Sequence, residues 1–142
     1  MAVVDRHDVA KGLYALLAAN GTIQTLLGNP PRIYVRPPRN ASFPWVRVDF
    51  LPASPWFGVC GDSWVRQVMV QFTAFAVETT LDTVAAIQAA IINVMDAAVG
   101  SISITNGNLR RVLPGTEAID FDENNTAYSV TEYTLSVQYA AA

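Results

Sequence analysis

Charged side chains, cysteine and histidine are scarce in this sequence. Of its 142 residues, 15% are charged and 51% are hydrophobic, whereas an ordinary soluble domain carries roughly 25% charged residues. Cys60 is the one cysteine and His7 the one histidine. A single cysteine excludes an intramolecular disulfide and a cysteine-based zinc site, because each needs several thiolates. The shortage of charge favours a domain that buries part of its outer surface against other chains.

Long apolar runs and a secretion signal are also lacking. The most apolar stretch, residues 84–99, is interrupted by Gln88, Asn93 and Asp96, so it does not resemble the roughly 20 apolar residues of a membrane-spanning helix. Asp8 stands near the N-terminus, where a signal peptide would need positive charge. The length is that of one domain. We therefore expect a single domain over residues 1–142, made in the cytoplasm, with no membrane partner.

Strong basicity is absent as well. The net charge of −3 argues against a protein that grips nucleic acid, since dense Lys and Arg surfaces perform that work. Lys11 is the one lysine beside eight arginines. Arginine is favoured at protein interfaces because its guanidinium is weakly hydrated, although a GC-rich genome produces the same bias.

Hydrophobic periodicity predicts the order of the elements. Apolar residues at helical spacing indicate a first helix, a short second one that Thr22 could cap, and a long third one that begins after Thr79 or Thr80 and ends at Gly100. Alternating segments predict strands, and Asn106-Gly107 favours a hairpin turn between residues 101–105 and 109–113. The helices are expected at 6–19, 23–27 and 80–99, the strands at 32–36, 43–51, 64–75, 101–105, 109–113 and 126–139, and a loop at 52–63.

This order predicts an α+β fold. We expect a mainly antiparallel sheet of about four to five strands packed by two main helices, because few connections are long enough for parallel crossovers.

No combination of residues forms a recognisable active site. His7 lies in the first turn of the expected helix without a serine or cysteine motif beside it. Cys60 has apolar neighbours, which favours a small buried hydrophobe over a nucleophile. Asp120, Asp122 and Glu123 could supply oxygen ligands to a cation, but their spacing lacks the glycine and closing glutamate of a calcium loop. We therefore expect no enzyme, no metal and no cofactor.

Two features remain as candidate interfaces. The loop at 52–63 is unusually apolar, and aromatic side chains of this kind dominate protein contacts once they are desolvated; the alternative is a loop folded back on its own core. Four arginines, at 36, 39, 110 and 111, could pair across a subunit boundary or simply be solvated. The candidate interface residues are Trp56, Phe57, Val59, Trp64, Arg36 and Arg39.

An ordered set of short apolar phrases resembles the tail-completion, or tail-terminator, family of long-tailed bacteriophages. The resemblance covers residues 8–139, although Thr73 stands where the family often has an acidic residue in the central strand. The phrases are Leu26-Leu27-Gly28, Arg32-Ile33-Tyr34-Val35, Phe43-Pro44-Trp45-Val46-Arg47-Val48, Val70-Gln71-Phe72-Thr73-Ala74-Phe75 and Tyr133-Thr134-Leu135-Ser136-Val137-Gln138-Tyr139.

The resemblance implies a structural virion protein that forms a ring, commonly hexameric. Such a ring caps the finished tail tube, ends its polymerisation and offers a surface to the head connector. The expected partners are copies of the chain itself, the tail-tube protein and a head-closure or connector protein, at the head-proximal end of a tail assembled in the host cytoplasm. A ring of heterologous contacts buries two different patches on every subunit, which would explain the low charge.

DNA would pass through the ring without specific binding. A neutral or acidic lumen repels phosphates, so Asp120, Asp122 and Glu123 are candidates for the lumen lining. Two other functions stay open. One is a head-closure or neck ring protein, and the other is a small α+β enzyme or ligand-binding domain whose pocket is lined by Trp56, Trp64 and Tyr34.

Overall fold

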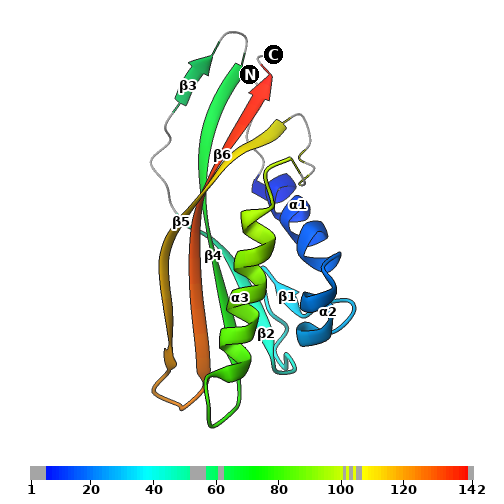
Figure 1. Cartoon of the computed structure of the whole chain (residues 1–142), viewed down its shortest axis with the longest axis vertical. Helices are drawn as coiled ribbons and strands as arrows, with labels where there is room; N and C mark the ends of the chain where they lie inside the picture. Colours follow the sequence, from blue (N-terminus) through cyan, green and yellow to red (C-terminus); the bar gives the residue numbers. More distant parts are fainter. Residues whose placement is uncertain are drawn as a thin grey trace.

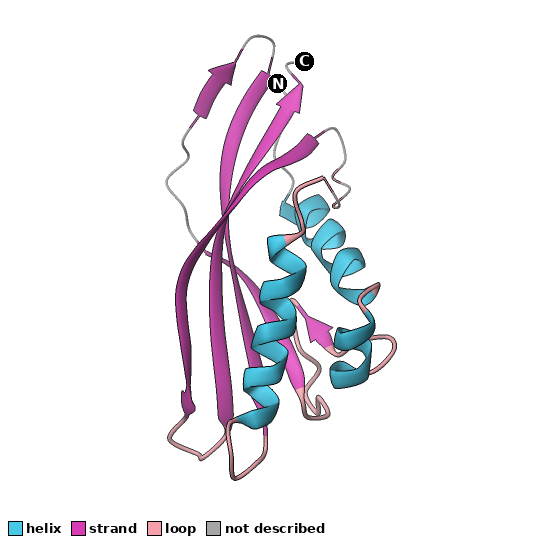
Figure 2. Ribbon diagram, viewed as in Figure 1, coloured by secondary structure: helices cyan, strands magenta, loops and turns pink. Residues whose placement is uncertain are grey.

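The structure is a twisted sheet with three helices on one face. The computed structural model describes residues 6–51, 57–60, 63–100, 102, 104 and 107–140, without the side chains of residues 6, 7, 57–60, 63, 64, 66, 139 and 140. Figure 2 shows the helical layer on one side of the strands. The helices are α1 (Arg6–Ala18), α2 (Gly21–Leu27) and α3 (Asp82–Asp96). None of these described helices is long and apolar enough to cross a membrane.

The junction between α1 and α2 is set by Asn20. Its side-chain oxygen accepts a hydrogen bond from the amide of Ile23 at 3.1 Å, as an N-cap does. The cap expected from the sequence was Thr22, so that detail is wrong: Thr22 lies inside α2, whereas Asn20 directly precedes its first residue, Gly21, and has the extended backbone that a cap needs. Gly28 ends α2 with φ of 89°, a left-handed value that favours glycine.

The sheet contains six strands. In the order in which they pair, five form the path β1-β2-β4-β6-β5, while β3 pairs with β4 (Figure 1). Only the short β1 runs parallel to its neighbour, and the other pairs are antiparallel. The α+β prediction with a mainly antiparallel sheet is confirmed, with one strand more than expected. The strands are β1 (Ile33–Tyr34), β2 (Trp45–Leu51), β3 (Phe57–Cys60), β4 (Ser63–Ala76), β5 (Gly107–Phe121) and β6 (Ala127–Ala140).

The core lies between the sheet and the helices. Alternate residues of β4 and β6 face it, and α3 contributes the apolar stripe that its sequence predicts. Phe72 and Tyr133 are the largest of the fully buried side chains and meet edge to face, with 6.3 Å between ring centroids. The buried stripe of α3 includes Val84, Ile87, Ile91, Val94 and Met95.

Part of the expected loop at 52–63 is a strand. Residues 57–60 form β3, which pairs with the start of β4, so that Cys60 lies opposite Ser63. The two residues between them in sequence, Gly61 and Asp62, are of the types that favour two-residue hairpin connections. The sequence nevertheless predicts a loop over this stretch, because proline and glycine interrupt its apolar residues. Figure 1 shows β3 and the adjoining end of β4 extending past the helical layer.

The strand β5 is longer than the sequence indicates. Its expected end was residue 113, with a loop up to the last strand, yet pairing with β6 continues to Phe121. Pro114 does not break the strand because β5 is an edge strand with a β-bulge between Pro114 and Glu117. Of the expected 101–105 strand, only Ile104 is seen to pair, as an isolated bridge to Gly107. Residues 101, 103, 105 and 106 lie outside the described residues.

Candidate functional site

Four of the six interface candidates fall where side chains are not described. Trp56 lies outside the described residues, and Phe57, Val59 and Trp64 are placed only by the backbone of β3 and β4. The prediction that this apolar segment forms an interface therefore stays a prediction. The ligand pocket considered for Trp56, Trp64 and Tyr34 also stays untested, and of these Tyr34 belongs to a surface cluster on the sheet.

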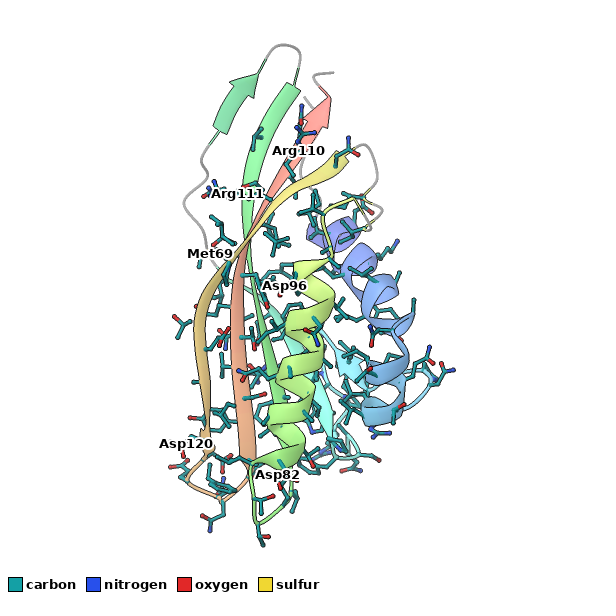
Figure 3. All side chains as sticks on the ribbon, viewed as in Figure 1. Met69, Asp82, Asp96, Arg110, Arg111 and Asp120 are labelled. Atoms are coloured by element: carbon teal, nitrogen blue, oxygen red, sulfur yellow. The ribbon has the colours of Figure 1, made fainter. Side chains whose placement is uncertain are left out.

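The arginines do not gather in one place. Arg36 and Arg39 are exposed on the connection that follows β1, at one edge of the sheet. Arg110 and Arg111 are exposed on β5, at the opposite edge, and lie at the far end of that strand from Asp120 (Figure 3). A shared basic patch is thereby excluded, and the two edges of the sheet have separate surfaces.

The face of the sheet opposite the helices carries an aromatic cluster. Trp45 is its centre, with its ring 4.7 Å from Phe75, 6.3 Å from Tyr34 and 6.5 Å from Phe43 between centroids. Trp45 and Phe75 are direct cross-strand partners, and Tyr128 continues the row on β6 opposite Phe75. In the described chain no helix covers this face, so part of the aromatic surface of the cluster stays exposed.

One ion pair lies within the same face. The guanidinium nitrogen Nε of Arg47 donates to Oδ2 of Asp49 at 2.8 Å, and the carbon Cζ of Arg47 lies 5.8 Å from the centroid of Phe75. Both side chains remain partly exposed, at 42% and 37%. Such surface pairs contribute little to stability. The guanidinium therefore stays available to groups that approach the aromatic cluster.

Hydrophobic alternation in the sequence indicates the face of the sheet on which this cluster lies. Alternation along residues 43–51 placed Arg47 and Asp49 on the face away from the core, and Trp45 has the same parity. Phe75 has the parity of Gln71 and Thr73 in the next long strand. Their convergence depends on the register between β2 and β4, which composition does not reveal.

The three acidic candidates have different roles in the fold. Oδ1 of Asp122 accepts hydrogen bonds from the amides of Asn124 at 2.8 Å and Thr126 at 2.9 Å, so this carboxylate shapes the β5–β6 turn. Asp120 belongs to β5 and not to a loop, and Glu123 lies in the turn. Asp120 and Glu123 are exposed at this end of the molecule. The sequence placed the trio correctly near one another but missed that Asp122 is structural.

A segment of β5 is exposed on both faces of the sheet. All eight residues from Leu113 to Asp120 are exposed, although they form a regular part of the edge strand apart from one bulge. They include apolar residues that alternate between the two faces, among them Leu113 and Ile119 at 36% and 38% exposure. We name residues 113–120 the β5 arm. A long, uncovered edge strand is a surface that proteins usually protect or pair.

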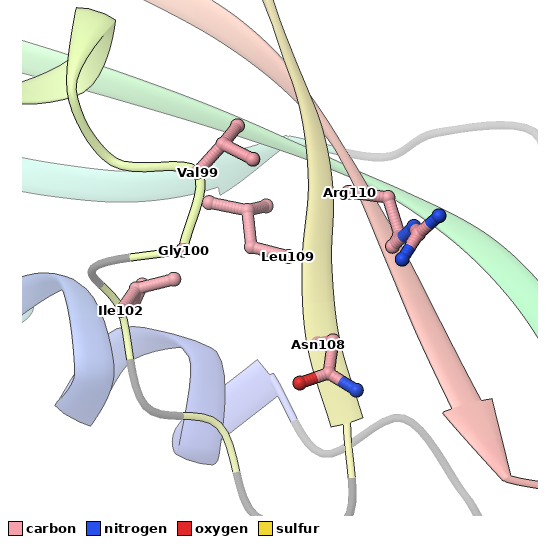
Figure 4. A pocket seen from close by; sticks show the side chains of 6 residues that line it. All are labelled: Val99, Gly100, Ile102, Asn108, Leu109 and Arg110. Carbon is pink, nitrogen blue, oxygen red and sulfur yellow. The ribbon is translucent and has the colours of Figure 1, made fainter.

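Two depressions lie beside the helical layer. One is open, has a volume of about 550 Å³ and is lined by Val99, Gly100, Ile102, Asn108, Leu109 and Arg110 (Figure 4). It borders positions outside the described residues. The other is a small apolar hollow of about 30 Å³ between α1 and the β1 edge, beside the exposed residues Tyr14 and Val35. Within the described residues, no group of three or more metal-ligating side chains converges.

Gln88 and Tyr133 are among the polar side chains buried where the helices meet the sheet. Gln88 of α3 donates from Nε2 to the carbonyl oxygen of Val130 at 3.0 Å and to that of Ala118 at 3.5 Å. Burial raises the pKa of the Tyr133 phenol to about 12, with further contributions from the negative charges of Asp96 and Glu117. Gln88 thus fastens α3 to β5 and β6, and burial keeps the phenol of Tyr133 neutral.

The family model described as "Tail completion protein gp17" matches residues 11–134. The chain belongs to this family. A search among curated proteins found no match. Among solved structures, a chain of the "Virion of native gene transfer agent (GTA) particle" has a TM-score of 0.76, with 14% sequence identity over 96% of this chain and 99% of that one. At this identity the likeness concerns the fold.

Membership in the tail completion family confirms the resemblance seen in the sequence. It makes the chain a structural component of a bacteriophage virion, and more specifically of its tail. A structural protein of this kind acts through its contact surfaces, so these surfaces are its candidate functional sites. The surfaces described above are the aromatic face of the sheet, the two sheet edges and the acidic β5–β6 turn.

Proposed function

We propose that this tail completion protein forms a ring, hexameric in the finished virion, at the head-proximal end of the tail. The ring caps the tail tube, ends its polymerisation and joins the tail to the head connector. It assembles in the host cytoplasm from copies of this chain and works through its interfaces without catalysing a reaction. Family membership supports the tail assignment, and the surfaces of the subunit support the finer statement.

The observation that carries the proposal is the uncovered aromatic face. Trp45, Phe75 and their neighbours form a half-exposed cluster on a sheet whose other face already holds the core. Aromatic residues with one arginine are the composition of contact surfaces that become desolvated. We assign this face to the tail-tube protein. Two further surfaces, the sheet edges, then remain for contacts between copies, as a ring of heterologous contacts requires.

The lumen lining stays as first inferred from the sequence. Asp120 and Glu123 are exposed at the β5–β6 turn, which Asp122 holds in shape. A ring with this turn directed inward presents carboxylates to passing DNA, which repel phosphates and prevent adhesion. Replacing Glu123, which lies outside the strand β5, by lysine is expected to leave rings intact and slow DNA ejection. Unchanged ejection from such virions would contradict the assignment.

Loss of the gene product in infected cells tests the proposed role. A terminator defect is expected to give overlong tails without heads, visible by electron microscopy. Leaking filled heads beside tails of normal length would instead identify a head-closure protein and overturn the capping proposal. The purified chain, mixed with tail-tube subunits, is expected to yield rings on tube ends. Trp45→Glu should abolish binding to tubes while the variant remains folded by circular dichroism.

A further inference from the structure

We propose that the β5 arm of one subunit docks on the β1 edge of the next subunit. This inference rests on the proposed ring and names the contact that closes it. The β1 edge is defined here by Tyr14, Val35, Arg36 and Arg39. The two surfaces lie at opposite ends of the sheet path, since β1 is its first strand and β5 its last. A contact between opposite edges repeats head to tail, which is how rings are built.

Charge complementarity favours this pairing. The charged residues of the β5 arm are Glu117 and Asp120, both acidic, and those of the connection at 35–44 are Arg36 and Arg39, both basic. All four side chains are exposed. The one ion pair found within the described part of the chain joins two other residues, on β2. The arm and the edge are therefore oppositely charged surfaces that form no ion pair with the described part of their own chain.

The same charges disfavour symmetric contacts. Two arms brought together would oppose Glu117 and Asp120 to their own copies, and two β1 edges would oppose arginines to arginines. Like charges placed against one another at an interface cost free energy and suppress the wrong partner. An arm placed on an edge removes both repulsions. This asymmetry selects the heterologous contact over a two-fold dimer.

Apolar surface on the two sides also matches. The arm exposes Leu113 and Ile119, at 36% and 38%. The β1 edge exposes Val35 at 60% and Tyr14 at 39%, beside the apolar hollow of about 30 Å³ between α1 and β1. A hollow of this size accepts the end of one aliphatic side chain. Docking would cover the arm, whose strand pairs with β6 on one side and is an edge of the sheet on the other.

Several features of β5 act against non-specific pairing of this edge strand. Pro114 removes one backbone donor from the edge, and the bulges at Leu109 and Pro114 interrupt its regular ladder. These features hinder open-ended strand addition by other chains. Side-chain contacts with the β1 edge need no such ladder, so assembly through them stays specific.

Two complementary variants test the contact. The arm variant carries Glu117→Arg and Ile119→Asp, and the edge variant carries Arg36→Glu and Arg39→Glu. Each alone is expected to weaken self-association by about tenfold or more in sedimentation velocity. An equimolar mixture of the two variants is expected to stay weakly associated too. The intact arm of the edge variant meets the normal β1 edge of the arm variant, but the arm of the arm variant keeps a net negative charge and faces an acidic edge, so heterodimers form and grow no further. Circular dichroism verifies that both variants are folded.

A charge exchange within one chain supplies the rescue. Glu117→Arg and Asp120→Arg combined with Arg36→Glu and Arg39→Glu are expected to recover most of the assembly that the two arm changes alone lose. Glu123→Arg, an exposed charge reversal outside the arm, is the matched control and should leave the rings unchanged. If wild-type chains form rings and both variants form them equally well, the arm contact is overturned and the ring proposal stands. Rings that persist but no longer bind tail-tube subunits would assign the arm to the tube, which also overturns it. Wild-type chains that never assemble, even on tubes, would overturn the ring itself.

Discussion

Trp45 and Phe75 stack across neighbouring strands, with 4.7 Å between their ring centroids and 31° between their planes. They occupy directly opposed positions of β2 and β4. Such aromatic pairs add about 0.5–1.5 kcal/mol beyond the area they bury. The pair faces away from the core, so its aromatic surface remains accessible for binding while its mutual contact stabilises the sheet.

Replacing Trp45 by alanine should separate these two roles. We expect the free energy of unfolding to fall by about 1–2 kcal/mol, since one cross-strand aromatic contact is lost and the core is untouched. Urea denaturation followed by fluorescence measures this change. Binding to tail-tube subunits should be lost. Val77→Ala, an exposed apolar residue on the β4–α3 connection, serves as control and should alter neither quantity. Full tube binding by Trp45→Ala would remove the aromatic face from the proposed function.

Gln88 fastens α3 to the sheet through the carbonyl oxygens of Val130 and Ala118. Gln88→Leu should lower the free energy of unfolding by about 1–2 kcal/mol, because buried acceptors lose their donor. Gln88→Glu should be more damaging at neutral pH, since a carboxylate would face two carbonyl oxygens at a position only 7% exposed. Thermal unfolding at pH 7 and pH 4 tests this, and the Glu variant should regain stability at the lower pH. Wild-type stability of both variants at neutral pH would show that the two hydrogen bonds do not contribute to stability.

The elements that periodicity predicted well are those with one clear apolar side. The stripe of α3 and the alternation around Tyr133 place the same residues inside that the structure buries. The fold class followed from them because two amphipathic helices must cover one face of a sheet. Local pattern was sufficient wherever burial on a single face decides the structure.

The full length of β5 could not be predicted from hydrophobic periodicity. Its residues from Leu113 to Asp120 are exposed on both faces, so their apolar residues are not confined to one face, and Pro114 indicates a break. Only pairing with β6 keeps them extended. The aromatic cluster was missed for a related reason, since Trp45 and Phe75 meet through register. Surface clusters that form only when strands distant in sequence pair are hard to predict from the local sequence pattern.

Asp122 holds the β5–β6 turn through two amide hydrogen bonds, at 2.8 and 2.9 Å. Asp122→Ala is expected to cost about 1–2 kcal/mol of unfolding free energy, as the loss of a side-chain cap does. Asp122→Asn keeps an acceptor oxygen and should cost much less. Glu123→Ala, in the same turn, should be nearly neutral. Guanidinium denaturation of the three variants measures the order, and an Asn variant as unstable as the Ala variant would show that charge, and not the hydrogen bonds, shapes the turn.

Tyr133 should limit stability at alkaline pH. Its pKa is raised from 10.0 to about 12 in the folded chain, first because it is buried and then because Asp96 and Glu117 are negative. Between these two values the unfolded chain has released the phenolic proton and the folded chain still holds it. The unfolded state therefore binds fewer protons, so stability is complete below pH 10 and falls as pH rises towards 12. Two pKa units correspond to roughly 3 kcal/mol for this group.

Tyr133→Phe isolates the effect of the phenol. The variant keeps the ring that meets Phe72 edge to face, so it is expected to unfold near the wild-type midpoint at pH 8. At pH 11 it should be the more stable protein, by an amount that urea denaturation can resolve. Tyr14→Phe is the control, because Tyr14 is an exposed tyrosine on α1, at 39%, and removing its hydroxyl should leave the alkaline loss of stability in place. Parallel loss of stability in wild type and Tyr133→Phe between pH 9 and 11 would place the alkaline transition at other groups.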